Sequence, residues 1–411
     1  MTKQIPQGYK QTKVGIIPED WDVVKIGDVC DCIVPGRNKP VDFNGNIPWV
    51  TTPDITTKYI CDTKSNLYIT IEEAKKIGSK VVPKNSVIMS CVGELGLLSI
   101  VKKEIVINQQ LHAFIPSSQV NTEFLHYVLG TQKKYMDSVA TKTAVPYMNK
   151  DNCNSIPIPL PKVKEQEKIA EILSTWDDAI TKQGQLIEQK QVLKKGIMQQ
   201  IFTQKIRFKD DNGNDYPDWE EKHLDEICTF FSGGTPTSSN KDYYTGDIPF
   251  IGSGNISNNQ VEQFITNEAL KSSSAKMIEK GDLLLALYGA TSGQSAIAKL
   301  SGAINQAILC IRTQELKEFI FYWLQLNKDN ILSTYLQGGQ GNLSAQIIKQ
   351  LKLELPTLSE QIKIADFLIN VDDEITKQTE VLDQLKLQKQ SLMQKLLTGQ
   401  VRAFNYSKES A

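Results

Sequence analysis

The chain has 411 residues, and its 46 Lys and Arg residues nearly balance its 47 Asp and Glu residues, so the net charge is -1. This length accommodates two or three domains, and the composition is that of an ordinary soluble globular protein. The charge balance excludes binding to nucleic acid through overall positive charge. No apolar run reaches the ~18 residues of a membrane span. The polar start has no secretion signal, so we expect a cytoplasmic protein.

Cysteine and histidine usage bounds the covalent and metal chemistry. The seven cysteines are an odd number, which favours free thiols over a disulfide framework. Cys30 and Cys32 form the one close pair, and His112, His126 and His223 are scattered without the spacing of a zinc site. We therefore expect no metal site on this chain.

Residues 1–160 are predicted to form a mixed α/β globule. Short apolar runs rich in β-prone residues alternate with clusters of Gly, Pro, Asn and Ser. Residues 93–96 lie between two such runs and predict a hairpin connection. The segment carries 18 basic and 15 acidic residues. It is therefore only slightly positive.

Residues 161–207 are predicted to form one long helix. The stretch begins at Pro161, has no interior proline and is rich in Lys, Gln, Glu, Leu and Ile, which favours a helix of roughly 40 residues, about 60 Å long. Apolar residues recur in a strict 4,3 rhythm, which indicates a coiled-coil seam. The seam residues of this segment are Ile169, Leu173, Trp176, Ile180, Gln183 and Ile187.

Residues 208–355 are predicted to form a second globule that is related to the first. Trp219 follows a proline as Trp21 does, and Ile248–Ile251 resembles Ile47–Val50. Residues 289–293 predict a hairpin like that at 93–96. This segment carries 12 basic and 18 acidic residues, so any DNA contact must use local patches or a more basic partner.

Residues 356–411 are predicted to form a second long helix and a tail. Between Pro161–Arg207 and Pro356–Arg402, 19 of 47 positions are identical at a constant offset of 195, so the chain is an internal duplication. The seam residues here are Ile364, Leu368, Val371, Ile375, Gln378 and Leu382. Gln183 and Gln378 are either tolerated polar residues or a polar layer that fixes the register.

Together these elements predict an α+β fold. Two mixed α/β globules would be separated by two long antiparallel helices that form an intramolecular coiled coil with pseudo-twofold symmetry. The divergent loops between the repeated markers imply that the two globules have different binding preferences.

These features resemble the specificity subunit of a Type I restriction-modification system over almost the whole chain. The resemblance rests on the order of the parts, on Glu165-Gln166 and Glu360-Gln361 at the helix starts, and on the turn at 233–236. It implies two target recognition domains that recognise a bipartite, asymmetric DNA sequence, with the helix pair setting the spacer. It also implies docking of two modification subunits, which carry S-adenosylmethionine and methylate adenine N6. Restriction subunits would add ATP and Mg²⁺, while this chain would be non-catalytic and hold no cofactor.

Base edges are recognised by amide, hydroxyl and guanidinium groups, so the DNA-binding candidates are polar residues on the predicted loops. In the first globule they are Arg37, Asn38, Lys39, Thr51, Thr52, Gln109, Lys142, Thr143 and Tyr147. In the second globule they are Thr237, Ser238, Ser239, Asn240, Lys241, Ser253, Asn255, Tyr288, Thr291, Ser292, Gln294, Gln306, Gln340 and Asn342. Asn108 and Asn305 recur in both globules and are expected to be structural.

Two other functions would explain parts of the sequence. Asp54, Glu73 and Lys75 match the loose pattern of a metal-dependent endonuclease, although the run around Glu73 is helix-like. The adjacent acids Asp177 and Asp178 point about 100° apart on a helix and cannot converge on one substrate. A coiled-coil adaptor that binds no DNA would explain the helices but not the two globules.

Overall fold

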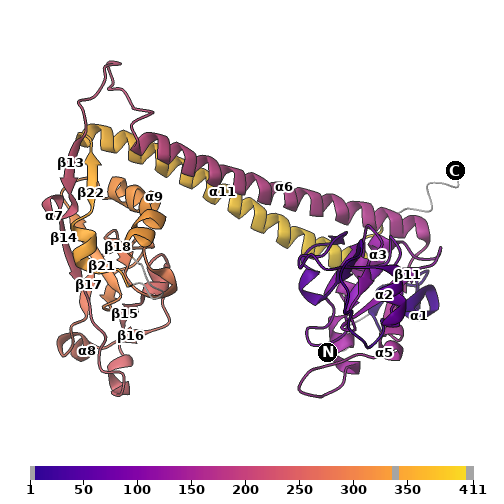
Figure 1. Cartoon of the computed structure of the whole chain (residues 1–411). Coiled ribbons are helices and arrows are strands. Elements are labelled where there is room, and N and C mark those ends of the chain that lie inside the picture. Colours follow the sequence, from indigo (N-terminus) through magenta and orange to yellow (C-terminus); the bar gives the residue numbers. More distant parts are fainter. Residues whose placement is uncertain (1–4, 336–341, 404–411) are drawn as a thin grey trace. The chain divides into compact units, whose positions relative to one another are not determined.

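The computed structural model describes residues 5–335 and 342–403, and Figure 1 shows the elements along the chain. The chain divides into two compact units, residues 1–183 with 381–411 and residues 184–380. Each unit combines one globule with part of both long helices. Neither unit is therefore built from one half of the sequence alone.

The first globule contains short strands and helices arranged around two sheets. Its elements are β1 (Tyr9–Thr12), β2 (Gly15–Pro18), β3 (Asp22–Lys25), α1 (Ile26–Val29), β4 (Cys30–Ile33), β5 (Ile47–Val50), η1 (Thr52–Asp54), β6 (Tyr59–Ile60), β7 (Tyr68–Ile69), α2 (Ile71–Lys76), β8 (Val87–Ser90), β9 (Leu98–Val101), β10 (Val106–Ile107), β11 (Leu111–Pro116), α3 (Thr122–Gly130), α4 (Lys133–Val139), α5 (Lys150–Asn154) and β12 (Pro157–Leu160). The larger sheet has the order β4-β11-β8-β9-β6, and the smaller one has the order β10-β5-β7.

The second globule repeats this plan. Its elements are β13 (Glu220–His223), α7 (Leu224–Ile227), β14 (Cys228–Ser232), η2 (Lys241–Tyr244), β15 (Ile248–Ile251), η3 (Ser253–Asn255), β16 (Phe264–Ile265), α8 (Asn267–Lys271), β17 (Lys276–Ile278), β18 (Leu283–Ala286), η4 (Gly289–Thr291), β19 (Ser295–Ile297), β20 (Gly302–Ile304), β21 (Ile308–Thr313), α9 (Lys317–Tyr335), α10 (Ala345–Lys349) and β22 (Lys352–Leu355). Its sheets have the orders β14-β21-β18-β19 and β16-β15-β20-β17.

The two predicted hairpins are confirmed. β8 pairs antiparallel with β9, and β18 pairs antiparallel with β19. Gly93 and Gly289, which begin the two connections, have φ angles of 75° and 78°, in the left-handed region that glycine adopts without strain. The same turn chemistry therefore recurs in both globules.

Both long helices are present as continuous elements of 40 residues, α6 (Val163–Phe202) and α11 (Leu358–Leu397). Each begins two residues after the proline that was expected to precede it. Within each unit the start of one helix packs beside the end of the other, so the segments run antiparallel. In the first unit, Ile169 and Leu173 share a hydrophobic core with Leu396 and Leu397. In the second unit, Ile364 and Leu368 share a core with Met198 and Ile201.

The predicted seam follows the less exposed side of both helices. Ile169, Leu173, Ile364 and Leu368 are fully buried against the globules. The other predicted seam residues are buried or half-buried, and none is exposed: Trp176, Ile180, Gln183, Ile187, Val371, Ile375, Gln378 and Leu382. Burial is deepest where a helix meets its globule.

All seven cysteines are free, as the sequence predicted. Within residues 5–335 and 342–403, no helix has the length and apolar character that crossing a membrane requires.

Candidate nucleic-acid interface

A buried carboxylate joins each globule to both helices, and it belongs to the Glu-Gln pair that starts each long helix. Glu165 accepts hydrogen bonds from Trp21 Nε1 at 3.1 Å and from Arg402 Nε at 2.8 Å. Glu360 accepts the equivalent bonds from Trp219 Nε1 at 3.0 Å and from Arg207 Nε at 3.2 Å. In both units the arginine follows the end of the opposite helix.

The glutamine of each pair fixes the loop before the globule's main helix. Gln166 Oε1 accepts the amide of Asn121 at 2.8 Å, and its Nε2 donates to the carbonyl of Pro161 at 2.8 Å. Gln361 Oε1 likewise accepts a hydrogen bond from the amide of Leu316 at 3.1 Å, and its Nε2 donates to the carbonyl of Pro356 at 2.9 Å. Both Glu-Gln pairs are fully buried, so the motif holds the scaffold together.

The first acid of each Asp-Asp pair also has a structural role. Asp372 accepts hydrogen bonds from Tyr322 Oη at 2.9 Å and from Lys194 Nζ at 2.6 Å. Asp177 accepts the equivalent bonds from Tyr127 and Lys389. Burial alone would raise the pKa of Asp177, but these two hydrogen bonds lower it. The acids thus connect helices rather than perform acid-base chemistry.

In the first globule, three predicted DNA-binding residues lie at one edge of the small sheet. β5 and β10 are parallel, so the residues that follow them, Thr51, Thr52 and Gln109, are brought to the same edge. Thr52 Oγ1 donates to Gln110 Oε1 at 3.2 Å, which joins the two loops. Gln109 is exposed, while both threonines are half-buried.

The loop at residues 141–147 is attached to the same edge. The amide of Cys91 donates to the carbonyl of Gln110 at 2.8 Å, and the amide of Gly93 donates to the carbonyl of Pro146 at 2.9 Å. Lys142, Thr143 and Tyr147 are all exposed on this loop. Six of the nine predicted residues of the first globule therefore lie on hydrogen-bonded neighbouring loops.

The other three, Arg37, Asn38 and Lys39, are exposed on a loop with a different anchor. A Cβ on Gly36 would lie 2.0 Å from the carbonyl oxygen of Ile77, so glycine is needed for this contact with the segment after α2.

In the second globule, the turn at residues 233–236 packs against the equivalent edge of the sheet. A Cβ on Gly233 would lie 1.7 Å from the carbonyl oxygen of Ile304, and Thr235 Oγ1 donates to Gln306 Oε1 at 2.7 Å. β15 and β20 are parallel, so Ser253 and Gln306 lie at one edge, as Thr52 and Gln109 do.

The predicted DNA-binding residues of the second globule differ in exposure. Thr237, Ser238, Ser239, Lys241, Gln306 and Asn342 are exposed; Asn240, Ser253, Asn255, Tyr288, Thr291 and Gln294 are half-buried. Ser292 is 8% exposed and donates to the carbonyl of Leu287, so it supports the turn. Asn240 Oδ1 accepts a hydrogen bond from the amide of Asp242, so Asn240 caps the start of η2. Gln340 lies outside the described residues.

Asn108 and Asn305 perform the structural role expected of them. Asn108 Oδ1 accepts the amide of Gln110 at 3.1 Å, and Asn305 Oδ1 accepts the amide of Ala307 at 3.0 Å. The same turn, with the exposed Gln109 or Gln306 that follows the asparagine, is therefore kept in both globules.

The nuclease pattern does not form an open metal site. Asp54 Oδ2 accepts the amide and the hydroxyl of Thr51 at 2.7 and 2.8 Å, and its Oδ1 accepts the amide of Lys64 at 2.7 Å. Glu73 Oε1 accepts the amide of Val41 at 2.8 Å. Both acids are 6% exposed and bind loop backbone, so they act as loop anchors.

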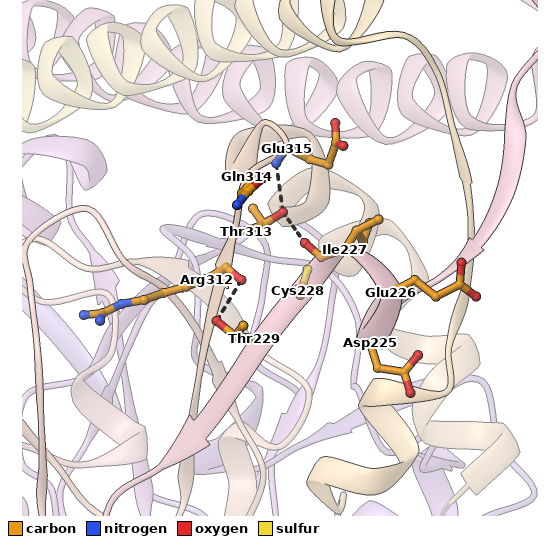
Figure 2. Close-up of a pocket in the computed structure, with 9 residues that line it drawn as sticks. All are labelled: Asp225, Glu226, Ile227, Cys228, Thr229, Arg312, Thr313, Gln314 and Glu315. Atoms are coloured by element: carbon orange, nitrogen blue, oxygen red, sulfur yellow. Dashed lines mark hydrogen bonds between the residues drawn. The ribbon is translucent and has the colours of Figure 1, made fainter.

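The pocket in Figure 2, with a volume of about 510 Å³, is not part of either polar edge. It lies where β14 begins and β21 ends, and Asp225, Glu226 and Glu315 line it. Its one arginine, Arg312, extends away from these acids and pairs with Asp282 at 2.8 Å. An acidic lining repels phosphate, so this pocket is unsuited to DNA.

Sequence spacing missed two groups that the fold assembles. Within the Trp-Glu-Arg groups, directly bonded residues are up to 237 positions apart in sequence, so no local sequence motif predicts these groups. Cys91, His112 and Cys153, which are far apart in sequence, are buried together, with their ligand atoms within 4.8 Å of one another. They come from three different elements, which spacing along one segment cannot reveal.

Two globules of one plan with different exposed loops, each carried by a pair of helix segments, define a duplicated recognition protein with one surface per globule. A model of the Type I restriction modification DNA specificity domain matches residues 18–190 and again residues 216–387. The chain belongs to this family, which confirms the resemblance inferred from the sequence.

Relatives support the assignment over the full length. The Type I restriction enzyme MjaVIII specificity subunit of Methanocaldococcus jannaschii is 27% identical, covering 97% of both chains. The putative MjaX specificity subunit of the same organism is 28% identical over 96% of this chain and 97% of its own. The EcoR124I/EcoR124II specificity subunit of Escherichia coli is 27% identical over 35% of this chain and 37% of its own.

Solved structures confirm the fold class. A type I restriction-modification structure described in terms of complex assembly and conformational transition gives a TM-score of 0.64 at 17% identity, covering 94% of this chain and 99% of that chain. The S subunit from M. genitalium gives 0.55 at 16% identity, covering 92% and 96%.

Proposed function

We propose that this chain recognises a split DNA sequence, one half with each globule, and places two modification subunits on that sequence. The observation that carries the proposal is the polar edge of each globule. The turns at Asn108 and Asn305, each followed by an exposed glutamine, are the same, but other polar residues at the edge differ, such as Thr52 and Ser253. The turns shared by the two globules keep the geometry, and the side chains that differ between them change the bases that are recognised.

The polar edges also suit DNA better than the alternatives do. Arg37, Lys39 and Lys142 are exposed in the first globule and can contact phosphates, whereas the acids of the nuclease pattern are bonded to backbone. We therefore expect the chain itself to be non-catalytic. S-adenosylmethionine would be carried by the modification subunits, and ATP and Mg²⁺ by restriction subunits. The cytoplasmic location stays a prediction.

Single exposed apolar residues at equivalent places on the two repeats support docking of two modification subunits. On the helix segments of the first unit, Val163, Val381 and Leu387 are 39, 46 and 58% exposed. Their repeat equivalents in the second unit, Leu358, Leu186 and Val192, are 50, 38 and 68% exposed. Their recurrence at the same places in both repeats is what two copies of one partner would require.

Replacing one of these exposed apolar residues in each unit tests the stoichiometry. We expect Leu387→Asp or Val192→Asp each to reduce binding from two modification subunits to one, because a charge in an apolar interface is not compensated. Native mass spectrometry of the assembled complex measures the change. The double variant should bind none, and the exposed Gln388→Asp serves as a charge-matched control. If either single variant still binds two subunits, docking occurs elsewhere.

Substituting the equivalent exposed glutamines tests recognition by separate globules. We expect Gln109→Ala to weaken binding about 10-fold only on DNA with the intact first half-site, and Gln306→Ala to do so only for the second half-site. Gel shifts of the assembled complex at several salt concentrations separate base from phosphate contacts. An equal loss on scrambled DNA, or a loss at both half-sites from one variant, would contradict the proposal.

A further inference from the structure

One group of potential metal ligands lies in the core of the first globule. Cys91 follows β8, His112 lies on β11, and Cys153 lies on α5. Cys91 and Cys153 are fully buried and His112 is 1% exposed. The two sulfur atoms are 3.4 Å apart, and all three ligand atoms lie within 4.8 Å of one another. Sheet and helix thus bring three residues from distant parts of the sequence to one point.

Their chemistry matches a thiophilic metal. Zinc binds Cys sulfur at about 2.3 Å and His nitrogen at about 2.0 Å, so the ligand atoms of a tetrahedral site lie roughly 3.5–3.8 Å apart. The sulfur atoms, 3.4 Å apart, would have to separate by about 0.4 Å, and the widest separation would have to close by at most about 1 Å. A thiolate and imidazole set favours zinc over Mg²⁺ or Ca²⁺, which prefer oxygen.

His112 gives an independent indication. Its Nδ1 is buried and has no hydrogen-bond partner among the described residues. A buried polar atom without a partner is costly, and proteins rarely keep one without a reason. A metal ion bound to the ring would give this polar side chain a function in the core.

The second globule shows what the same place looks like without ligands. The strand registers pair His112 with Met89 and Leu309 with Leu285, so Leu309 is the counterpart of His112. Leu287 likewise corresponds to Cys91, since both donate their amides to the loop after the equivalent parallel strand. Leu287, Leu309 and Ile348, the counterpart of Cys153, all belong to one apolar core. The fold therefore does not need polar groups here.

We propose that Cys91, His112 and Cys153 bind a zinc ion in the core of the first globule. Cys32 pairs with Phe114 and so faces the same side of the sheet as His112, but its sulfur lies outside the 4.8 Å group, so the fourth ligand is either Cys32 after a shift or a water molecule. Each thiol gives its proton to solvent on binding. The ion would connect β8, β11 and α5 directly beneath the loop at residues 141–147. The metal assignment does not depend on the proposed function.

The matched variants are His112→Leu and Cys310→Ala. His112→Leu installs the residue type of the second globule and leaves all seven cysteines in place, so any loss of zinc cannot be attributed to lost thiols. Cys310→Ala removes a fully buried thiol of the second globule. The full-length protein is purified under reducing conditions, supplied with Zn²⁺ and analysed by elemental mass spectrometry.

We expect about one zinc per chain in the wild-type protein and in Cys310→Ala, and at least a 10-fold lower content in His112→Leu. Co²⁺ should give the visible absorption of a tetrahedral thiolate site, which tests the wild-type chain directly if His112→Leu does not fold. Equal zinc in the wild type and His112→Leu, absence of the Co²⁺ spectrum, or a Cys91–Cys153 disulfide under reducing conditions would each overturn the proposal.

Discussion

Replacing Glu165 with alanine is expected to lower the free energy of unfolding of the first unit by about 3 kcal/mol, because the change leaves the buried Trp21 Nε1 without its acceptor and Arg402 with Asp20 as its remaining ionic partner. The value is at the low end for a broken buried ion pair, since the Arg402 side chain is 32% exposed and water can solvate part of it. Glu360→Ala should have the same effect on the second unit, where Arg207 and Trp219 lose their hydrogen bonds to Glu360.

Hydrogen exchange in denaturant measures the two units separately. Glu165→Ala should lower protection in residues 5–183 and leave 208–360 near wild type, and Glu360→Ala should do the reverse. The exposed Glu167→Ala is the matched control and should change stability by under about 0.5 kcal/mol. A loss below about 1 kcal/mol for Glu165→Ala, or equal losses in both units from one variant, would show that the buried carboxylates are not the anchors of separate units.

Inserting one heptad after Gln183 and another after Glu380, where the chain passes between its compact units, should change the DNA target without changing either half-site. Seven helical residues add about 10 Å, close to three base pairs of B-DNA. We expect affinity for the original target to fall at least about 100-fold and to return on DNA with a spacer about three base pairs longer, because specific binding needs both halves at once.

Binding to DNA libraries with fixed half-sites and varied spacers measures this change. The matched control inserts the same seven residues at the exposed turn at Asn212, outside the long helices, and should keep the original spacer. New half-site sequences, or an unchanged spacer optimum in the helix variant, would contradict the role of the helices as the spacer.

Repetition made much of the fold predictable from sequence. The 195-residue offset and the heptad rhythm gave the two long helices and their antiparallel pairing, and the glycine turns gave two hairpins that the structure confirms. These features are local or periodic, so they leave a pattern along the chain.

The contacts that depend on the folded chain left no such pattern. Glu165 was visible only as part of a motif, and its bonds to Trp21 and Arg402 require both ends of the chain. His112 has no zinc-ligand spacing to other residues in the sequence, yet a strand pairing and α5 bring two thiols to it. The DNA-binding residues stay predictions, since base recognition depends on loop geometry and on the shape of the DNA.

The first unit is completed by the last helical turn of the chain. Leu396 and Leu397 close its hydrophobic core, and Gly399, with a φ of 66°, accepts a hydrogen bond from Tyr9 at 2.8 Å. During synthesis on the ribosome, the hydrophobic core of the first globule therefore cannot be completed until the whole of the second globule has emerged. A nascent chain that terminates early leaves apolar surface uncovered near its beginning, where chaperones and proteases can detect it.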